Sequence, residues 1–409
     1  MNPKHLVVIG GGAAGFFCAV TAARLNPGLK VSILEKSSRL LSKVRISGGG
    51  RCNVTHALFT IDELVRRYPR GKNFIKKTFH QFFTTDTIKW FEERGVSLKA
   101  ERDGRMFPVT DSSQTIIDCL MKEANKYKVE IRLNTEVKDL ERKSGQWQLS
   151  FANGHTMPAD FICVAAGGYP KATMFDWLRK LGHSVSEPVP SLFTLNLPGH
   201  PITQLMGVSV EQARVKIGNT KLVEEGPVLI THWGLSGPAV LRLSAWGARD
   251  LKDLGYDFNV HINWLPEYTD ASMREAFSGF RKANPVKKVS NHNFGSLPER
   301  LWLFLLQQSG ISTDLRFCDL PAKAENSLIK NLVDFVAAVR GKTTFKEEFV
   351  TAGGITLTEV DAATLMSRKV PNLFFAGEVL DIDGITGGFN FQNAWTTGYI
   401  AGKTISEME

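Results

Sequence analysis

The pattern of hydrophobic and polar positions predicts a βαβ unit at the beginning of the chain. A short apolar run, Leu6–Ile9, ends in three glycines and is followed by a longer, mainly apolar segment. A second short run, Lys30–Leu34, ends at Glu35. Short apolar runs bounded by glycine or charge are typical of buried strands, and the longer segment between them is typical of a buried helix.

The glycines between the first strand and the helix predict a binding site for an adenine dinucleotide. Gly10 permits a tight turn, Gly12 lets the backbone approach a pyrophosphate, and Gly15 lets the helix pack closely on the strand. The N-terminus of the helix then faces the anion. Glu35, 20 residues after Gly15, is placed to accept hydrogen bonds from a ribose, and a carboxylate there favours an unphosphorylated ribose.

The remaining pattern predicts an α/β fold whose first domain is interrupted by an insertion. From about residue 191 the alternation of strands and helices gives way to strand-like segments, residues 271–339 are mostly helical in pattern, and the last sixty or so residues return to strand, glycine and helix. We therefore predict a Rossmann-type domain over 1–190 plus 342–409. The inserted region, 191–341, is expected to be β-rich over about 191–265 and mainly helical over about 266–341.

Composition indicates a globular protein of a reducing compartment. The 409 residues include five widely spaced cysteines with no Cys-x-x-Cys pair and no histidine cluster, which favours neither disulfides nor a bound metal. The apolar stretch after Lys4 and His5 has features of a signal peptide, but glycines interrupt it and Glu35 follows in the register of the dinucleotide motif. We expect a cytoplasmic protein without a membrane span.

The net charge of +9 exceeds what two phosphates would require, so nucleic acid has to be considered as a partner. Much of the excess lies in local groups, such as 66–77 and 281–288, without a recognisable nucleic-acid-binding motif. A solvated basic surface is the favoured interpretation of these groups, and a nucleic-acid-binding face remains the alternative.

Two further glycine-rich segments, 43–53 and 376–390, point to a long ligand. The first contains three consecutive glycines, and we expect it to form neither a helix nor an internal strand. The second follows a short apolar run that ends at Ala376-Gly377. If that run is a strand beside the first one, the second segment can hold the far end of the ligand, which favours FAD over NAD.

The assembled motifs resemble a bacterial family of FAD-dependent flavoproteins known as NAD(P)/FAD-dependent oxidoreductases, some of which reduce carbon–carbon double bonds in steroid-like acids. The resemblance covers nearly the whole chain. It rests on four blocks: Gly10–Gly15 with Glu35; Lys43–Asn53; Thr231–Pro238; and Thr351–Gly354 with Phe375–Gly384 and Gly387-Gly388. The chain departs from the family at Tyr169–Thr173, where a longer serine- and glycine-rich loop is usual.

The resemblance implies a set of FAD contacts. Asp383 would bond the ribityl or phosphate region, and Gly388, Phe389 and Asn390 would bring backbone N–H groups and a helix N-terminus to the flavin ring, where positive charge stabilises reduced flavin. The full set of expected cofactor-binding residues is Gly10, Gly12, Ala14, Gly15, Glu35, Lys36, Lys43, Gly50, Arg51, Cys52, Asn53, Val137, Ala166, Gly167, Gly377, Asp383, Gly388, Phe389 and Asn390.

Two residues in these blocks invite a chemical role. Cys52 has no partner cysteine in sequence, so we interpret it as a packed thiol against the cofactor, with thiol–disulfide chemistry as the alternative. His232 could supply a proton or bind an anionic substrate, although a lone histidine is more often structural. Trp233 could stack on a flat substrate or belong to the core.

The sequence thus predicts an FAD-dependent oxidoreductase that reduces an unsaturated or conjugated small organic acceptor, with NAD(P)H as a transient electron donor. No second Gly-x-Gly-x-x-Gly motif follows a strand, so a separate nicotinamide domain is not expected, and an electron-carrier protein could replace NAD(P)H. The alternatives are a flavin-containing binding or sensory protein with an RNA-contacting basic surface, and an oxidase or hydroxylase that uses oxygen.

Overall fold

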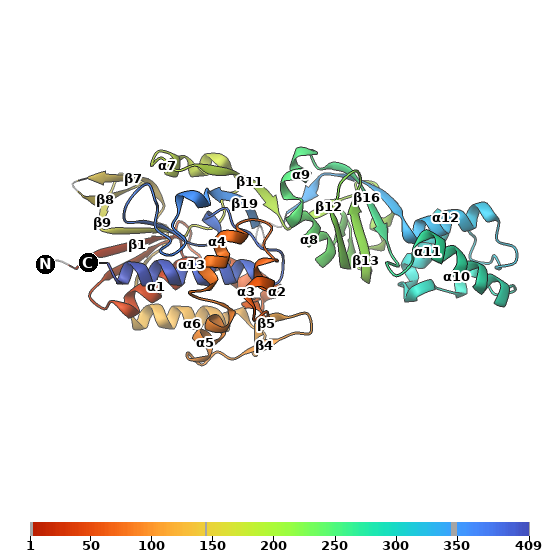
Figure 1. Cartoon of the computed structure of the whole chain (residues 1–409), viewed down its shortest axis with the longest axis horizontal. Helices are drawn as coiled ribbons and strands as arrows, with labels where there is room; N and C mark the ends of the chain where they lie inside the picture. Colours follow the sequence, from red (N-terminus) through yellow and green to blue (C-terminus); the bar gives the residue numbers. More distant parts are fainter. Residues whose placement is uncertain (1–2, 144, 345–349, 409) are drawn as a thin grey trace. The chain divides into compact units, whose positions relative to one another are not determined.

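The computed structural model describes residues 3–143, 145–344 and 350–408, and the chain divides into two compact units. Unit 1 comprises Met1–Ser191 and Lys346–Glu409, and unit 2 comprises Leu192–Phe345. Colours that are far apart in the sequence bar, red and blue, meet in unit 1 of Figure 1, so the two ends of the chain build one unit.

Unit 1 is built around a five-stranded parallel sheet with helices packed on it. The strand order is β20-β10-β1-β2-β6, and each neighbouring pair is parallel. Parallel sheets are covered on both faces, which explains why β1 and β10 are almost wholly apolar and buried. The bounds are β20 Leu373–Phe375, β10 Phe161–Val164, β1 His5–Ile9, β2 Lys30–Leu34 and β6 Glu130–Arg132.

Glycines let the first helix of the chain pack closely against the last. Helix α1 (Ala13–Leu25) packs along α13 (Phe389–Ser406), as Figure 1 shows. A Cβ on Gly398 would collide with the Ala14 carbonyl oxygen, and a Cβ on Gly402 with that of Cys18. The two helices therefore approach to backbone contact, which fixes the C-terminal segment against the βαβ unit.

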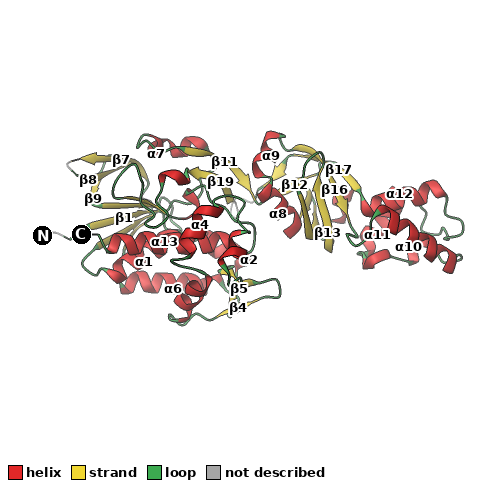
Figure 2. Ribbon diagram, in the orientation of Figure 1, coloured by secondary structure: helices red, strands yellow, loops and turns green. Residues whose placement is uncertain are grey.

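Three smaller sheets and further helices complete unit 1 (Figure 2). The sheets are β7 Val137–Lys143, β8 Gln146–Phe151 and β9 Thr156–Ala159; β3 Thr55–His56, β5 Arg105–Pro108 and β4 Leu98–Ala100; and β11 Val185–Ser191 with β19 Val350–Ile355. The helices are α2 Ser42–Gly50, α3 Ile61–Val65, α4 Lys72–Phe79, α5 Thr84–Glu92, α6 Ser113–Lys126 and α7 Asp176–Arg179.

Unit 2 combines an antiparallel sheet with a group of helices over one continuous apolar core. The seven strands follow the order β17-β16-β13-β14-β15-β12-β18. Their bounds are β17 Phe335–Arg340, β16 Asp257–Asn263, β13 Ser209–Ile217, β14 Val223–Thr231, β15 Gly234–Ser236, β12 Thr194–Asn196 and β18 Lys342–Thr343. The helices are α8 Pro238–Trp246, α9 Ala248–Asp253, α10 Asp270–Ala283, α11 Glu299–Gln308 and α12 Ala322–Val333.

The predicted fold class, a Rossmann-type domain interrupted by a β-rich and a helical part, is confirmed, but two local expectations were wrong. The glycine-rich segment after Leu41 begins as helix α2 and becomes non-helical only at Ser47–Gly49. The region expected to be mainly helical contains α10, α11 and α12, and also strand β17, whose residues alternate between buried and exposed. Strand β20 does not lie beside β1, because β10 is between them.

Candidate functional site

The sequence-predicted cofactor residues of unit 1 gather mainly at the carboxyl ends of the parallel strands. In the order β20-β10-β1-β2, the chain proceeds from β1 to β2 on one side, while β10 lies on the other side of β1. Ligands of open α/β sheets bind where the strand order reverses in this way. The carboxyl ends of β1 and β10 are therefore the expected position of a dinucleotide.

In the turn between β1 and α1, Gly10 and Gly15 are closely packed, whereas Gly12 faces open space. A Cβ on Gly10 would collide with the backbone of Ala165, and a Cβ on Gly15 would collide with the Gly10 carbonyl oxygen. No atom lies within 4 Å of a Cβ built on Gly12. Gly12 is also the N-cap of α1, where no side chain caps the helix and the first turn has no acidic residue. The turn thus presents an uncapped, positive helix end to an open space.

Glu35 at the end of β2 is held by backbone donors. Its Oε2 accepts a hydrogen bond from the Gly11 amide at 2.9 Å, and its Oε1 accepts one from the Ser37 amide at 2.8 Å. These bonds orient the carboxylate beside the glycine turn. Its predicted ribose contact remains a prediction, as do those of its neighbours Lys36, which is exposed, and Val137, which begins β7.

The segment Lys43–Asn53 contributes both open glycines and paired charges. Gly49 and Gly50 have positive φ angles, and a Cβ on either would meet nothing within 4 Å. The Lys43 ammonium lies 2.6 Å from Glu378 of the C-terminal segment. Arg51 pairs with Glu101 at 2.6 Å and stacks on the Phe107 ring. The charge of Arg51 is thus already compensated within the chain, and its predicted contact with the pyrophosphate or flavin edge stays a prediction.

Cys52 is completely buried, and its backbone has a positive φ angle. Desolvation raises the pKa of its thiol to about 12, so the thiol is protonated at neutral pH. Because the thiolate is the reactive form, this environment favours the packed-thiol interpretation over thiol–disulfide chemistry.

The C-terminal segment after β20 is fixed by contacts to the loop and helices that follow α2. The Asn53 side chain lies between Thr55 and Gly388, with its oxygen 3.0 Å from the Gly388 amide. His56 stacks on the Phe389 ring and contacts the Gly387 carbonyl oxygen at 2.9 Å. Asn390 closes its own turn through two hydrogen bonds to the backbone of Gly384.

Asp383 has partners within the protein. Its carboxylate is fully buried, accepts two hydrogen bonds from the Arg70 guanidinium and accepts a third from Ser191 Oγ at 2.9 Å. Burial raises the pKa of Asp383, and the bonds from Arg70 and Ser191 counteract that rise. This arrangement holds the segment in place, and a direct contact between Asp383 and the cofactor stays a prediction.

The residues of this edge fit an FAD molecule. Gly12, Gly49, Gly50 and Gly167 all adjoin open space, whereas glycines that only serve packing, such as Gly10, adjoin backbone. The hydroxyl of Thr351, buried beside Gly168, has no hydrogen-bond partner among the described residues. An extended ligand with an anionic centre would use the open backbone and the uncapped helix end.

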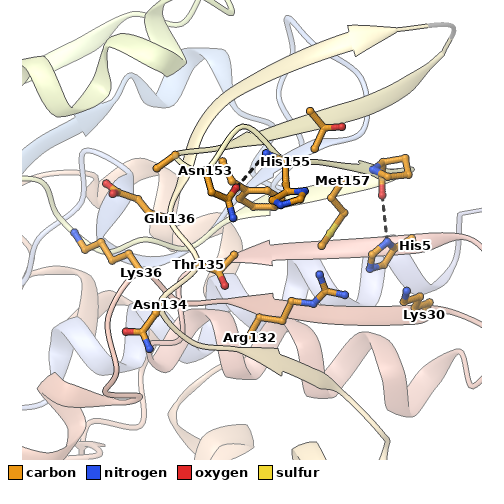
Figure 3. Close-up of a pocket in the computed structure, with 14 residues that line it drawn as sticks. His5, Lys30, Lys36, Arg132, Asn134, Thr135, Glu136, Asn153, His155 and Met157 are labelled. Carbon is orange, nitrogen blue, oxygen red and sulfur yellow. Dashed lines mark hydrogen bonds between the residues drawn. The ribbon is translucent and has the colours of Figure 1, made fainter.

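A polar cleft of about 700 Å³ adjoins the Glu35 side of this edge (Figure 3). Lys36, Asn134 and Glu136 lie at one end, and His5 and Lys30 lie at the other. The Thr135 amide donates to the Glu35 carbonyl oxygen at 2.8 Å. The cleft therefore begins next to Glu35, the residue predicted to bind a ribose. No sequence pattern predicts this cleft, because its walls come from strand ends and the β8–β9 hairpin, which share no local motif.

In unit 2, His232 is exposed in the tight turn between β14 and β15. Thr231 Oγ1 closes this turn with the backbone of Gly234. The indole of Trp233 donates to Thr194 Oγ1 at 3.0 Å, and its ring meets the His232 ring edge to face. Exposure makes the imidazole accessible to a substrate, and its role stays a prediction.

Several residues that shape the site were missed in the sequence. Tyr68 and Arg70 carry no motif of their own, and Glu378 lies in a family block without having been assigned a role. Each of the three acts through a partner far away in the chain, so no local sequence signal could have found these contacts.

The comparison with known protein families gives a match over almost the whole chain. Residues 4–404 match the family described as HI0933-like protein Rossmann domain. The 3-dehydro-bile acid delta(4,6)-reductase of Clostridium scindens is 30% identical over 412 residues, which cover 99% of each protein. The ribosomal RNA dihydrouridine synthase of Escherichia coli is 31% identical over 415 residues, which cover 99% of this chain and 98% of that protein.

Solved structures with the same fold are more distant in sequence. A flavocytochrome c3 fumarate reductase aligns with a TM-score of 0.52 at 17% identity, over 99% of this chain and 78% of that one. The 3-ketosteroid-delta4-(5alpha)-dehydrogenase of Rhodococcus jostii aligns with a TM-score of 0.52 at 14% identity, over 99% and 97%. These likenesses show the fold.

Proposed function

This chain belongs to the HI0933-like family of Rossmann-domain proteins and is an FAD-dependent oxidoreductase, and we propose that it reduces a carbon–carbon double bond conjugated with a carbonyl group. The observation that carries the proposal is the full-length similarity to two proteins whose names describe reductions. A delta(4,6)-reductase acts on double bonds of a 3-dehydro acid, and dihydrouridine differs from uridine by two hydrogens across the bond conjugated with a ring carbonyl.

The two names share one chemistry: two electrons and two protons are added across an electron-poor double bond. FAD, when bound, supplies the two-electron step. The chain itself would hold the cofactor with the open glycines of both terminal segments and the uncapped end of α1. The segment Gly387–Asn390 would place a second helix N-terminus, that of α13, where negative charge develops.

A proton must also reach the substrate, and we propose His232 as its source. The imidazole is exposed on a turn that is closed by Thr231 and Gly234, so its position does not depend on a flexible loop. A positioned general acid of this kind contributes about a hundredfold or more in rate. We further propose that unit 2 supplies the substrate pocket and that NAD(P)H visits the site only transiently.

Two alternatives remain distinct from this proposal. A purely sensory flavoprotein that binds RNA without catalysis is not favoured by the relatives, whose names describe enzymes. An oxidase would use oxygen as acceptor, and none of the residues described above favours it. In the described part of the chain, we find no helix with the length and apolar character needed to span a membrane.

The test is anaerobic reoxidation of the flavin. FAD-loaded protein is reduced with NADH or NADPH and mixed with a 3-oxo-4,6-diene bile acid, with its saturated counterpart or with unmodified ribosomal RNA. We expect reoxidation by a conjugated acceptor, a product heavier by two hydrogens, and no reaction with the saturated acid. Reoxidation by oxygen alone, with no conjugated acceptor reduced, would contradict the proposal.

A further inference from the structure

The positive charge of the chain is concentrated in its first 110 residues. That part has 19 Lys and Arg against 8 Asp and Glu, whereas the rest of the chain has 31 against 33. Within it, residues 64–85 contain six Lys and Arg and no acidic residue. This stretch covers the end of α3, the following turn and all of α4.

One side of this stretch is fastened to the predicted flavin end of the site. Tyr68, which is buried, donates from its hydroxyl to the Phe389 carbonyl oxygen at 2.6 Å. The Arg67 carbonyl oxygen accepts the Ile385 amide at 2.9 Å, and Arg70 turns inward to Asp383. Helix α4 also packs on α13, whose labels are close together in Figure 1. The α3–α4 hairpin is thus fixed next to Gly387–Asn390.

The other side carries exposed cations. Arg66, Arg67, Lys72 and Lys77 are exposed, and none of the four makes an ion pair with a carboxylate of the described residues; we call these four residues the basic face. Lys76 pairs with Asp62 at 2.6 Å. Arg66 and Lys72 also act on this carboxylate: the pKa of Asp62 is lowered mainly by Lys76, and less by Arg66 and Lys72. The hairpin therefore presents an excess of positive charge at a fixed position, which Asp62 and Glu63 offset only in part.

We propose that the basic face binds the phosphate backbone of an RNA substrate and positions a uridine for reduction beside Gly387–Asn390, an inference that rests on the proposed reductase function. Several cations at a fixed position, with only Asp62 and Glu63 as acidic neighbours on the hairpin, match a chain of regularly spaced phosphates, and a small steroid acid with one carboxylate would not need them. The phosphate contacts supply affinity and register, and the reacting base is selected next to the flavin. RNA bases outside a helix can be splayed out for such contact.

The test is salt-dependent binding of a fluorescein-labelled RNA hairpin with uridines in its loop to the full-length, FAD-loaded protein. The variant R66Q/R67Q/K72Q/K77Q is compared with K122Q/K126Q/K128Q/K403Q, which removes the same charge from α6, from the turn just after it and from the end of α13. The first variant should bind at least about tenfold more weakly, and the slope of log affinity against log salt should fall in magnitude by about 3. The control variant should keep the wild-type slope.

The charge-preserving variant R66K/R67K/K72R/K77R shows whether charge is what matters, and it should bind as the wild type does. Flavin content and the unfolding temperature show that each variant is folded. Equal slopes for the two glutamine variants, or wild-type protein that binds anionic vesicles but not RNA, would overturn the proposal. Because this assay measures binding alone, its result is separate from that of the reoxidation experiment, in which the reductase function itself succeeds or fails.

Discussion

The turn between β1 and α1 and the segment Gly377–Asn390 both belong to the predicted cofactor site of unit 1, but they are built differently. The turn is made by local backbone: Gly10 and Gly15 pack against main-chain atoms, and Gly12 faces open space. The later segment is held by side chains from elsewhere in unit 1, including Arg70 and Tyr68. A ligand site can thus combine a self-contained motif with a segment whose shape depends on distant residues.

The largest effect is expected from Gly15→Val, which tests the packed side of the turn. Its side chain would collide with the Gly10 carbonyl oxygen, a main-chain atom that cannot move without displacing β1. The variant should lose about 4 kcal/mol or more of stability, measured by urea unfolding. Gly279→Val, at an exposed glycine of α10 with no atom nearby, is the control and should unfold like the wild type.

Asp383→Ala tests the side-chain contacts of the later segment. It leaves the Arg70 guanidinium, which is only 12% exposed, without its buried partner. We expect a loss of about 3–5 kcal/mol together with weaker flavin retention. The double variant Arg70→Met/Asp383→Leu should recover most of the stability, because both charges of the buried pair are removed together. A fully stable single variant would show that the ion pair does not hold the segment.

Tyr68→Phe removes one hydrogen bond from the same segment and leaves the ring in place. The Phe389 carbonyl oxygen loses its 2.6 Å donor in a buried position, so we expect a cost of about 1–2 kcal/mol in urea unfolding. If the cost were as large as that of Asp383→Ala, the ring position and not the hydrogen bond would be at fault.

The smallest effect is a dependence on pH that comes from His56, which packs against the later segment. Burial, and then the nearby Arg67, lower the pKa of His56, although its contact with the Gly387 carbonyl oxygen opposes this. A histidine with a lowered pKa contributes stability that is present above pH 6.5 and is lost as the pH falls through the lowered pKa. Between about pH 7.5 and about pH 5, the unfolding temperature of His56→Gln should therefore fall less than that of the wild type. Identical pH profiles would mean that the pKa of His56 is the same in the folded and the unfolded protein.

The sequence predicted the local half of the site better than the distant half. Gly10, Gly12 and Gly15 act within six residues, so their spacing alone indicates the turn and the helix. Glu35 is also close, since β2 is paired with β1. Arg70 and Tyr68, which bond Asp383 and Phe389, are more than 300 residues away from them in the chain, and no spacing rule reaches them. For the same reason the position of β20 beyond β10 could not be derived from its apolar run.

The insertion was predicted by its change of pattern, with one strand missed. Phe335–Arg340 alternates between buried and exposed residues, which is the period of a strand, but it directly follows α12 and is rich in alanine. This segment is a strand because it pairs with β16, and that pairing is a tertiary contact that the local sequence does not reveal.

The measurement that tests the central claim most directly is the flavin content of purified Gly12→Val. The backbone of Gly12, at φ −95° and ψ −170°, suits any residue, and no protein atom lies within 4 Å of the added Cβ. The variant should therefore fold, and unfold like wild-type protein stripped of its flavin, but contain little or no FAD, while Gly279→Val retains its flavin. Full flavin content in a folded Gly12→Val protein would contradict the placement of the dinucleotide at this turn.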